Sequence, residues 1–207
     1  MKRILFLITC LLCLSASAQD ARKVLDATAS RIRKGGDIQV TFTATSFSGT
    51  TEQGRTEGTM LLKGRKMQMD TPAMKTWYDG KTLWSYMPES GEVNVTTPTE
   101  KEMATMNPYS FLGAYKKGYK LSVKESTLRG HATYEVHMLA RYAGNLVQEV
   151  YIDINKADYT PLCVRVKQDD NWSRIAIHQY KSGLDIPDAQ FRFDASKHPE
   201  AEVIDLR

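Results

Sequence analysis

Residues Thr76–Val95 read TWYDGKTLWSYMPESGEVNV, three runs of alternating residues separated by two turn signals. The first signal, Asp79-Gly80, stands between two aromatic-rich runs. An Asp-Gly pair in this position predicts a tight hairpin, because both central turn positions favour positive φ. The second signal, Pro88–Gly91, turns the chain into EVNV. The stretch therefore predicts three consecutive antiparallel strands, with Asp79 in a bend rather than in a catalytic site.

The same alternation extends on both sides of this stretch. Upstream it begins with DIQVTFTATSF at Asp37, breaks at SGTTEQG, and continues through RTEGTMLLKG and KMQMD. Downstream it includes YKLSVKES, TYEVHMLA, VQEVYIDIN, PLCVRVKQ and WSRIAIHQY, and the chain closes with AQFRFD and EVIDLR. Short strands separated by Gly, Asn and Asp turns are typical of an antiparallel meander. We count about eleven strands, enough for a curved, unclosed barrel.

One segment, TPTEKEMATMNPYSFLGAYKKG, interrupts the strands with a helical pattern. Thr97 and Glu100 have the spacing of a capping box, with Pro98 at the first helical position. Asn107-Pro108 repeats the device and divides the segment into two short helices. We therefore predict a mainly β, α+β fold whose curved antiparallel sheet is covered by an N-terminal helix and by a helical insert at about residues 98–117.

Residues 1–18, MKRILFLITCLLCLSASA, have the three parts of a secretory signal peptide. Lys2 and Arg3 form a basic start, a short apolar core follows, and Ala16-Ser17-Ala18 has the pattern of a cleavage site. The apolar run is too short for a membrane span. A lipoprotein signal ending at Cys10 or Cys13 fits less well, because small residues precede neither cysteine. We expect this segment to be removed.

Residues 19–207 read as a single domain without repeats or linkers. The domain begins with DARKVLDATASRIRKGG, where Asp20 is placed to cap an amphipathic helix and Gly35-Gly36 to end it. No later segment approaches the roughly 20 apolar residues that cross a bilayer. Lys2 and Arg3 leave with the signal peptide, so the formal net charge falls from +4 to +2. Such a balance does not indicate a nucleic-acid partner.

No motif for catalysis or metal binding is recognisable. The histidines lie at none of the usual ligand spacings: His131, His137, His178 and His198. Asp169-Asp170-Asn171 resembles part of a calcium loop but lacks the glycine and the distal Glu, so we predict a hairpin turn there. Cys163 is the only cysteine after the signal peptide, which leaves no internal disulfide and favours a small packed residue. We therefore predict no enzyme activity, metal or cofactor.

Methionine is concentrated in two parts of the chain: the first strands (Met60, Met67, Met69, Met74 and Met87) and the insert (Met103 and Met106). Any single one of them is more simply a core filler. Methionine is also flexible and polarizable, and it is over-used on surfaces that adapt to varied apolar ligands. A curved sheet covered by helices is a place where such a ligand binds. The cluster therefore favours an apolar binding cavity.

Several features resemble the periplasmic outer-membrane lipoprotein carrier proteins, the LolA-like family. YDGKTLWSYMP, Tyr78–Pro88, is similar to the family signature D-G-x-x-L-W-x-Y, and NPYSFL, Asn107–Leu112, resembles its lid segment. The order of helix, strands, insert and strands also agrees along nearly all of residues 19–207. The resemblance implies a periplasmic monomer that shields the acyl chains of lipoproteins and carries them from the inner to the outer membrane. Its partners would be acylated lipoproteins, an inner-membrane exporter complex and an outer-membrane acceptor.

The resemblance also implies roles for individual residues. The cavity walls would be Val40, Phe42, Leu61, Met67, Met69, Trp84 and Tyr86, and the lid would be Met103, Met106, Phe111 and Leu112. The family often has an Arg-Pro after the strand corresponding to GTMLLKG, where the arginine latches the lid. Here the stretch is Lys63-Gly64-Arg65. Either Lys63 or Arg65 replaces that latch, or the latch is absent.

Other functions are compatible with the same pattern. A periplasmic sensor or chaperone that binds lipids or other hydrophobic molecules would use the same fold. A secreted lipid-processing enzyme would need a nucleophile or a metal constellation that the sequence does not display. A purely structural protein would have a filled interior. An apolar cavity would therefore favour the binding functions over the structural one.

Overall fold

The computed structural model describes residues 2–99, 102–103, 106, 115–116, 118–142 and 147–207, with side chains from residue 18 onward. Helix α1 (Lys2–Lys34) precedes six strands: β1 (Asp37–Ser48), β2 (Thr51–Lys63), β3 (Lys66–Asp70), β4 (Lys75–Tyr78), β5 (Leu83–Met87) and β6 (Glu92–Thr96). Five more strands follow the insert: β7 (Tyr119–Leu128), β8 (His131–Ala140), β9 (Glu149–Asn155), β10 (Pro161–Gln168) and β11 (Asn171–Leu184). The chain ends with two 3₁₀ turns, η2 (Asp188–Phe191) and η3 (Ala195–Lys197), and with β12 (Glu202–Asp205).

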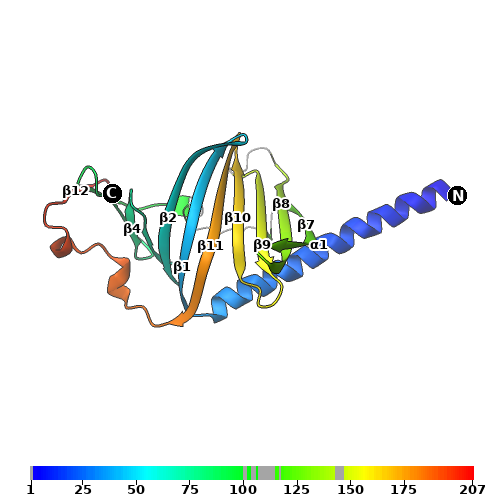
Figure 1. Ribbon diagram of the computed structural model, residues 1–207, viewed down its shortest axis with the longest axis horizontal. Helices are drawn as coiled ribbons and strands as arrows, with labels where there is room; N and C mark the ends of the chain where they lie inside the picture. Colours follow the sequence, from blue (N-terminus) through cyan, green and yellow to red (C-terminus); the bar gives the residue numbers. More distant parts are fainter. Residues whose placement is uncertain (1, 100–101, 104–105, 107–114, 117, 143–146) are drawn as a thin grey trace.

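All the described strands belong to one curved, unclosed sheet (Figure 1). It has 12 strands in the order β12-β6-β5-β4-β3-β2-β1-β11-β10-β9-β8-β7, so the prediction of about eleven was one too few. Strands β6 and β7 are consecutive in the chain but lie near opposite ends of the sheet, and the insert connects them. Pairing is antiparallel throughout except between β12 and β6, which run parallel.

The segment AQFRFD was predicted as a strand, and this was wrong. Residues 188–191 form the 3₁₀ turn η2, which starts after Pro187 (φ −64°, ψ 143°). Proline fixes φ and lacks the N–H that a strand would donate. Phe191 is fully buried, and it anchors this turn against the protein. Phe191 and Phe193 therefore alternate in the sequence because each makes its own contact with the protein, and not because they lie in a β-strand.

The predicted break at SGTTEQG is shorter than expected. Strands β1 and β2 continue until Ser48 pairs with Thr51, so only Gly49 and Thr50 form the turn. Gly49 has φ +58°, a conformation that glycine adopts without strain. The long hairpin rises beyond the shorter strands beside it in Figure 1.

The bend at Asp79 is confirmed, with a different geometry from the one predicted. Only Gly80 has a positive φ, at +102°, and residues 79–82 form the connection. The Asp79 carboxylate accepts hydrogen bonds from the N–H groups of Lys81 (3.0 Å) and Thr82 (2.9 Å). Burial alone would raise the pKa of this carboxyl group, but the two N–H donors and the positive charges of Arg192 and Lys66 together lower it. Asp79 thus stabilises a turn.

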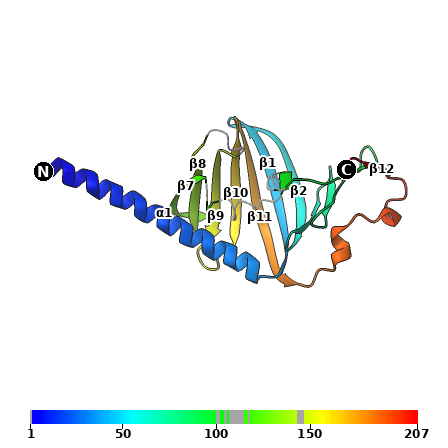
Figure 2. The same cartoon turned by 180° about the vertical axis from the view of Figure 1, so that it is seen from behind.

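Helix α1 is continuous from Lys2, so Asp20 lies within it and does not begin it. The chain has no Gly or Pro between the predicted signal peptide and DARKV, and nothing interrupts the helix there. The predicted end is confirmed, because the Gly35 N–H donates to the Arg31 carbonyl (3.0 Å) and Gly36 has φ +69°. Viewed from behind, α1 crosses one face of the sheet (Figure 2). We call this the inner face.

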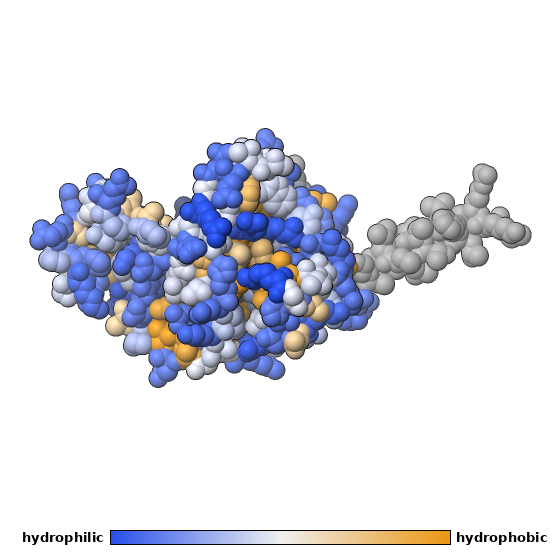
Figure 3. All heavy atoms as spheres, viewed as in Figure 1, coloured by the Kyte–Doolittle hydropathy of each residue, from blue (hydrophilic) through white to orange (hydrophobic). Residues whose placement is uncertain are grey.

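The inner face carries two clusters of apolar side chains. In the helix-covered half, formed by β7–β10, Leu25 and its neighbours on α1 pack on the strands; the buried strand residues are Tyr119, Leu121, Val136, Met138, Val150, Ile152, Ile154, Val164 and Val166. In the insert-covered half, formed by β1–β5 and β11, the buried residues are Ile38, Val40, Phe42, Met60, Leu62, Met67, Tyr78, Leu83 and Ile177. The opposite, outer face is largely hydrophilic (Figure 3).

Candidate functional site

An apolar cavity of about 120 Å³ lies on the inner face of the insert-covered half. Its wall consists of side chains from four strands and one residue of the insert: Val40, Phe42, Ala44, Met60, Met69, Ile175, Ile177 and Met106. Among the described residues, no polar side chain belongs to this lining. The position and the chemistry of the cavity make it the candidate functional site.

The pleat of the sheet explains why these residues meet. Val40 pairs with Met60, and Met60 pairs in turn with Met69, so the three side chains point to the same face. On the other side of β1, Phe42 pairs with Ile177. Residues directly opposite each other in neighbouring strands project from the same side of a sheet.

The structure brings only part of the predicted wall together. Val40, Phe42 and Met69 line the cavity, and Met67 is buried in the same apolar cluster. Leu61 belongs to the opposite face, because it lies between Met60 and Leu62 in an alternating strand.

Trp84 and Tyr86 are also on the outer face. Trp84 pairs with Trp77, which pairs with Gln68, and this row lies opposite the row that contains Met67. The C-terminal segment packs on two aromatic rings of this face: the ring centre of Tyr86 lies 4.7 Å from that of His198, and the ring centre of Trp77 lies 5.6 Å from that of Phe193. They pack within the protein and not against the cavity.

Four lining residues were absent from the predicted wall: Ala44, Met60, Ile175 and Ile177. Met60 had been noted only as a member of the methionine cluster. Ile175 and Ile177 are distant in sequence from the first strands, and they enter the site because β11 pairs with β1. The alternation within WSRIAIHQY was the available signal, but it does not identify the neighbouring strand.

The insert begins with a capping box, but two residues later than predicted. The Thr99 N–H donates to the Glu102 carboxylate (2.7 Å), and the Glu102 N–H donates to the Thr99 hydroxyl (3.3 Å). The Met103 N–H donates to the Thr99 carbonyl (3.0 Å), which is the first helical hydrogen bond. The hydrogen bonds from Thr99 lower the pKa of Glu102. Thr97 and Pro98 therefore precede the helix.

Two of the four predicted lid residues can be placed. Met103 and Met106 are half-buried and pack against the apolar cluster of the insert-covered half, and Met106 closes the cavity. Phe111 and Leu112 lie outside the described residues, as does Asn107-Pro108.

The far end of the insert is tied to α1. The hydroxyl of Tyr115, a buried residue, donates to the carboxylate of Asp26. Burial and this carboxylate raise the pKa of Tyr115 to about 12. The insert is therefore held at both ends, by the Thr99 cap and by the Tyr115 hydrogen bond.

The contacts of Lys63 point away from the insert. Its ammonium donates to the Ile186 carbonyl (2.6 Å) and lies 3.4 Å from Asp37 and 3.5 Å from Asp188. Lys66 also pairs with Asp188, at 2.5 Å. Lys63 thus anchors the segment that follows β11. Arg65 is exposed in the turn between β2 and β3.

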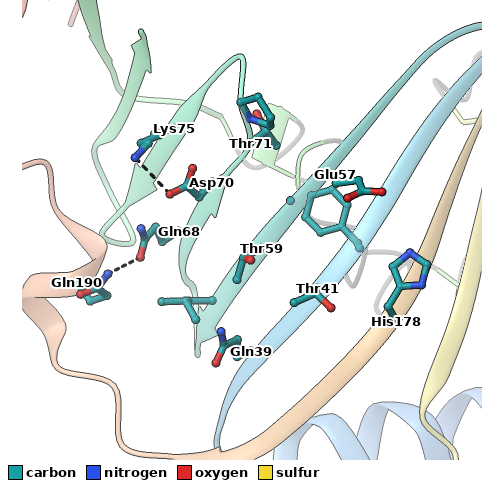
Figure 4. A pocket seen from close by; sticks show the side chains of 14 residues that line it. Gln39, Thr41, Glu57, Thr59, Gln68, Asp70, Thr71, Lys75, His178 and Gln190 are labelled. Carbon is teal, nitrogen blue, oxygen red and sulfur yellow. Dashed lines mark hydrogen bonds and ion pairs between the residues drawn. The ribbon is translucent and has the colours of Figure 1, made fainter.

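A second hollow, of about 800 Å³, lies on the outer side of β1–β4 (Figure 4). It is lined mainly by amide, hydroxyl and charged side chains, including Gln39, Thr41, Thr59, Gln68 and Asp70. Phe42 lines both this outer groove and the inner cavity.

The histidine and cysteine side chains have structural contacts. His137 binds Glu149 (2.7 Å) and stacks on Tyr151, with 4.3 Å between ring centres. His178 binds the Thr43 hydroxyl (2.7 Å). Cys163 is buried as expected, and burial raises the pKa of its thiol to about 11.

The predicted turn at Asp169-Asp170 is confirmed, since it joins β10 to β11. Within the part of the chain that the structure describes, no group of three or more His, Cys, Asp or Glu side chains could hold a metal ion. Among those same residues, no helix combines the length and the hydropathy needed to span a bilayer.

Comparison with known proteins agrees with this architecture. An uncharacterized conserved protein from Thermus thermophilus superimposes with a TM-score of 0.60 at 13% identity, over 90% of this chain and 99% of that one. The lipoprotein LppX from Mycobacterium tuberculosis gives 0.53 at 8% identity (83% and 100% covered), and LprF from Mycobacterium bovis gives 0.51 at 11% identity (83% and 97% covered). These similarities show the fold alone.

A search of the curated proteins found no match. The model of one protein family, described as "Outer membrane lipoprotein carrier protein LolA", matches residues 11–170, more than half of the sequence. The chain therefore belongs to the LolA family of outer membrane lipoprotein carrier proteins.

Proposed function

We propose that this protein is a periplasmic carrier that binds the acyl chains of lipoproteins at the inner cavity and takes them from the inner to the outer membrane. The observation that supports this function is the cavity on the inner face, whose described lining residues are all apolar and include Met106 of the insert. Carrier activity needs such a surface, because each buried methylene contributes about 0.8 kcal/mol to transfer from water.

The size of the cavity indicates a closed, unloaded form. At about 120 Å³ it is smaller than the roughly 300 Å³ of an ordinary small-molecule pocket. An engineered apolar cavity of about 150 Å³ holds a benzene molecule, which is far smaller than an acyl chain. We infer that cargo enters when Met103 and Met106 move off the strands, together with Phe111 and Leu112.

Competition between the insert and the cargo would set the affinity. The side chains of the insert bury their own apolar surface on the sheet, so an acyl chain must displace them and gains only the difference. A carrier requires this balance, because cargo bound with the full burial energy would not be released. The methionine walls suit an exchange of occupants, because Met side chains adopt several shapes at little cost.

The carrier function also implies a location and partners for this protein. Residues 1–18 act as a signal peptide, and the carrier works as a monomer on residues 19–207 in the periplasm. It receives acylated lipoproteins from an inner-membrane exporter and delivers them to an outer-membrane acceptor. Because the described contacts of Lys63 hold the C-terminal segment, Arg65 is the better candidate for a lid latch.

Native mass spectrometry of the protein purified from periplasm without detergent tests this function. We expect bound lipoprotein or acyl lipid, and an N-terminus at Gln19 if the signal peptide is removed. Binding of free lipids without any lipoprotein would instead favour a hydrophobe-binding sensor or chaperone. A preparation in which neither lipid nor lipoprotein binds, even after incubation with membranes, would contradict the carrier function.

A further inference from the structure

Strand β2 has a free edge over more than half of its length. Strand β2 pairs with β1 from Thr51 to Leu62, but on its other side β3 pairs only with residues from Thr59, opposite Asp70, to Lys63, opposite Lys66. On this side residues Thr51–Gly58 therefore have no neighbouring strand, and among the described residues no backbone–backbone hydrogen bond occupies it. Such an edge is a template for another extended chain.

The free edge adjoins the outer groove. The groove occupies the fork where β3 leaves β2: Glu57, Gly58 and Thr59 lie on one side, and Asp70 and Thr71 lie on the other. In Figure 4 the labelled side chains of β1 and β2 face those of β3 and β4 across this fork.

Phe42 stands where the fork meets the inner cavity. A Cβ atom at Gly58 would lie 2.7 Å from Cζ of Phe42 and 2.8 Å from the Asp70 carbonyl oxygen, so the ring and the end of β3 both close over this glycine. Phe42 is the residue common to the two linings. A molecule with an apolar part in the cavity could therefore extend its polar part into the groove past Phe42.

We propose that the free edge of β2 binds the peptide segment that directly follows the acylated residue of a lipoprotein. This inference rests on the proposed function. The segment pairs antiparallel with residues Thr51–Gly58, in the continuation of β3. The polarity agrees: β3 runs toward the fork and ends there, and a lipoprotein carries its acyl chains at its N-terminus, so its peptide runs onward from the fork.

The chemistry of the groove favours a peptide over a charged headgroup. Its charges are already paired within the protein: Asp70 with Lys75 at 3.4 Å, and Glu57 with Arg55 at 3.7 Å. Gln68 is bound by Gln190 at 2.7 Å. The remaining amide and hydroxyl groups, on Gln39, Thr41 and Thr59, suit neutral partners such as peptide groups.

The two end strands of the sheet lack this combination. The outer edge of β7 lies at the end of the helix-covered half, and β12 lies at the opposite end of the sheet. Neither strand contributes a residue to the inner cavity or to the outer groove. The charged side chains Glu52, Arg55 and Glu57 disfavour pairing of β2 with a second copy of the chain, which is compatible with a monomer that accepts a different peptide.

Affinity measurements with synthetic lipopeptides test the inference. A diacylated cysteine amide measures acyl binding alone, and the same molecule extended by six Ala and Ser residues adds the peptide. We expect the extension to tighten binding about tenfold, from a few net backbone hydrogen bonds.

Two further ligands test the strand pairing itself. One carries N-methyl groups on the odd-numbered residues of the extension, and the other carries them on the even-numbered residues. In an antiparallel pair only alternate residues exchange hydrogen bonds with the neighbouring strand, so one register must lose the gain while the other keeps it.

The possible outcomes separate the inference from the proposed function. If the cysteine amide does not bind, both the carrier function and the peptide site are wrong. If it binds and the extension adds nothing, or if the two N-methylated registers behave alike, the peptide site is wrong and the carrier function stands. A phospholipid with the same chains that binds as tightly as the extended ligand would assign the groove to a headgroup and overturn the inference.

Amide hydrogen exchange gives a second readout on the intact protein. The extended lipopeptide should slow exchange in residues 51–58, and the register that loses the affinity gain should not. The outer edge of β12 is the internal control, since β12 ends the sheet and contributes no residue to the cavity or the groove. Equal protection of both edges, or of neither, would contradict the inference.

Discussion

The two halves of the inner face are covered in different ways. Over β7–β10, α1 and the strands form a filled cluster in which Val and Ile dominate, and Leu25 is fully buried. Over β1–β5 and β11, the cover is the insert, and Met60, Met69 and Met106 are among the residues that line the remaining space. Branched side chains are stiff at χ1, whereas Met is flexible. We propose that the helix-covered half stays closed, whereas the insert-covered half exchanges its cover for a ligand.

The largest expected effect comes from filling the cavity. Ala44 lines it, so Ala44→Phe places a ring in the space that cargo needs. Excluding about five methylenes costs about 4 kcal/mol, or roughly a thousandfold in acyl affinity. Titration with the diacylated cysteine amide measures this loss. Ala132→Phe, at an exposed position of β8, is the matched control and should bind normally. Full affinity in a folded Ala44→Phe protein would show that the cavity is not the site.

Leu25→Ala tests the permanence of the helix-covered half. Removing this fully buried side chain should lower the free energy of unfolding by about 2–5 kcal/mol, from lost burial and a new cavity. Urea unfolding measures this loss of stability. Met106→Ala, at the cover of the other half, should cost only about 1 kcal/mol because the side chain is half-buried. It should also tighten acyl binding, since the lid competes less. Equal losses in the two variants would remove the distinction between the halves.

The sequence predicts the strands and local bends because these depend on neighbouring residues. Period-two alternation identified β1–β11, Gly35-Gly36 ended α1, and Asp79-Gly80 placed a turn. The sequence could not show on which face of the sheet each side chain lies. Both sides of β5 carry large apolar residues, and on the outer face Trp77 and Tyr86 pack on the C-terminal segment, which is far away in sequence. The contributions of Ile175 and Ile177 likewise depend on the pairing of β11 with β1.

Tyr115→Phe tests the tie between the two covers. It removes only the hydroxyl that donates to Asp26, and hydrogen bonds to charged groups contribute about 1.5–3 kcal/mol, so unfolding should become easier by about 2 kcal/mol. The folded state raises the pKa of Tyr115 to about 12. Its contribution is therefore complete below the ordinary tyrosine pKa and is lost as pH rises through 12.

Urea unfolding of both proteins between neutral and alkaline pH measures the Tyr115 contribution. The stability difference between wild type and Tyr115→Phe should shrink only at the alkaline end. Tyr142→Phe, at an exposed tyrosine, is the control and should leave stability unchanged. A Tyr115→Phe protein as stable as wild type would mean that the insert and α1 are joined by packing alone.

The smallest effect concerns the start of the insert, where the sequence offers two capping boxes with equal spacing. Thr97 with Glu100 and Thr99 with Glu102 are equivalent locally, and the structure selects the second. Thr99→Ala should cost about 1 kcal/mol, and it should tighten acyl binding slightly because the lid is held less firmly. Thr97→Ala is the matched control, and calorimetric titration with the cysteine amide compares the two.

The acid dependence of the cap gives an independent check on this choice. Thr99 lowers the pKa of Glu102 in the folded state, so the contribution of the cap is present above the ordinary glutamate pKa and is lost as pH falls through the lowered value. Wild type and Thr97→Ala should both show this loss in full, and Thr99→Ala should show a smaller one, because it removes the hydroxyl donor to Glu102 and keeps the N–H donor of residue 99. If Thr97→Ala instead removed it, the insert would start two residues earlier, Met106 would occupy a different position on the helix, and its place at the cavity would have to be revised.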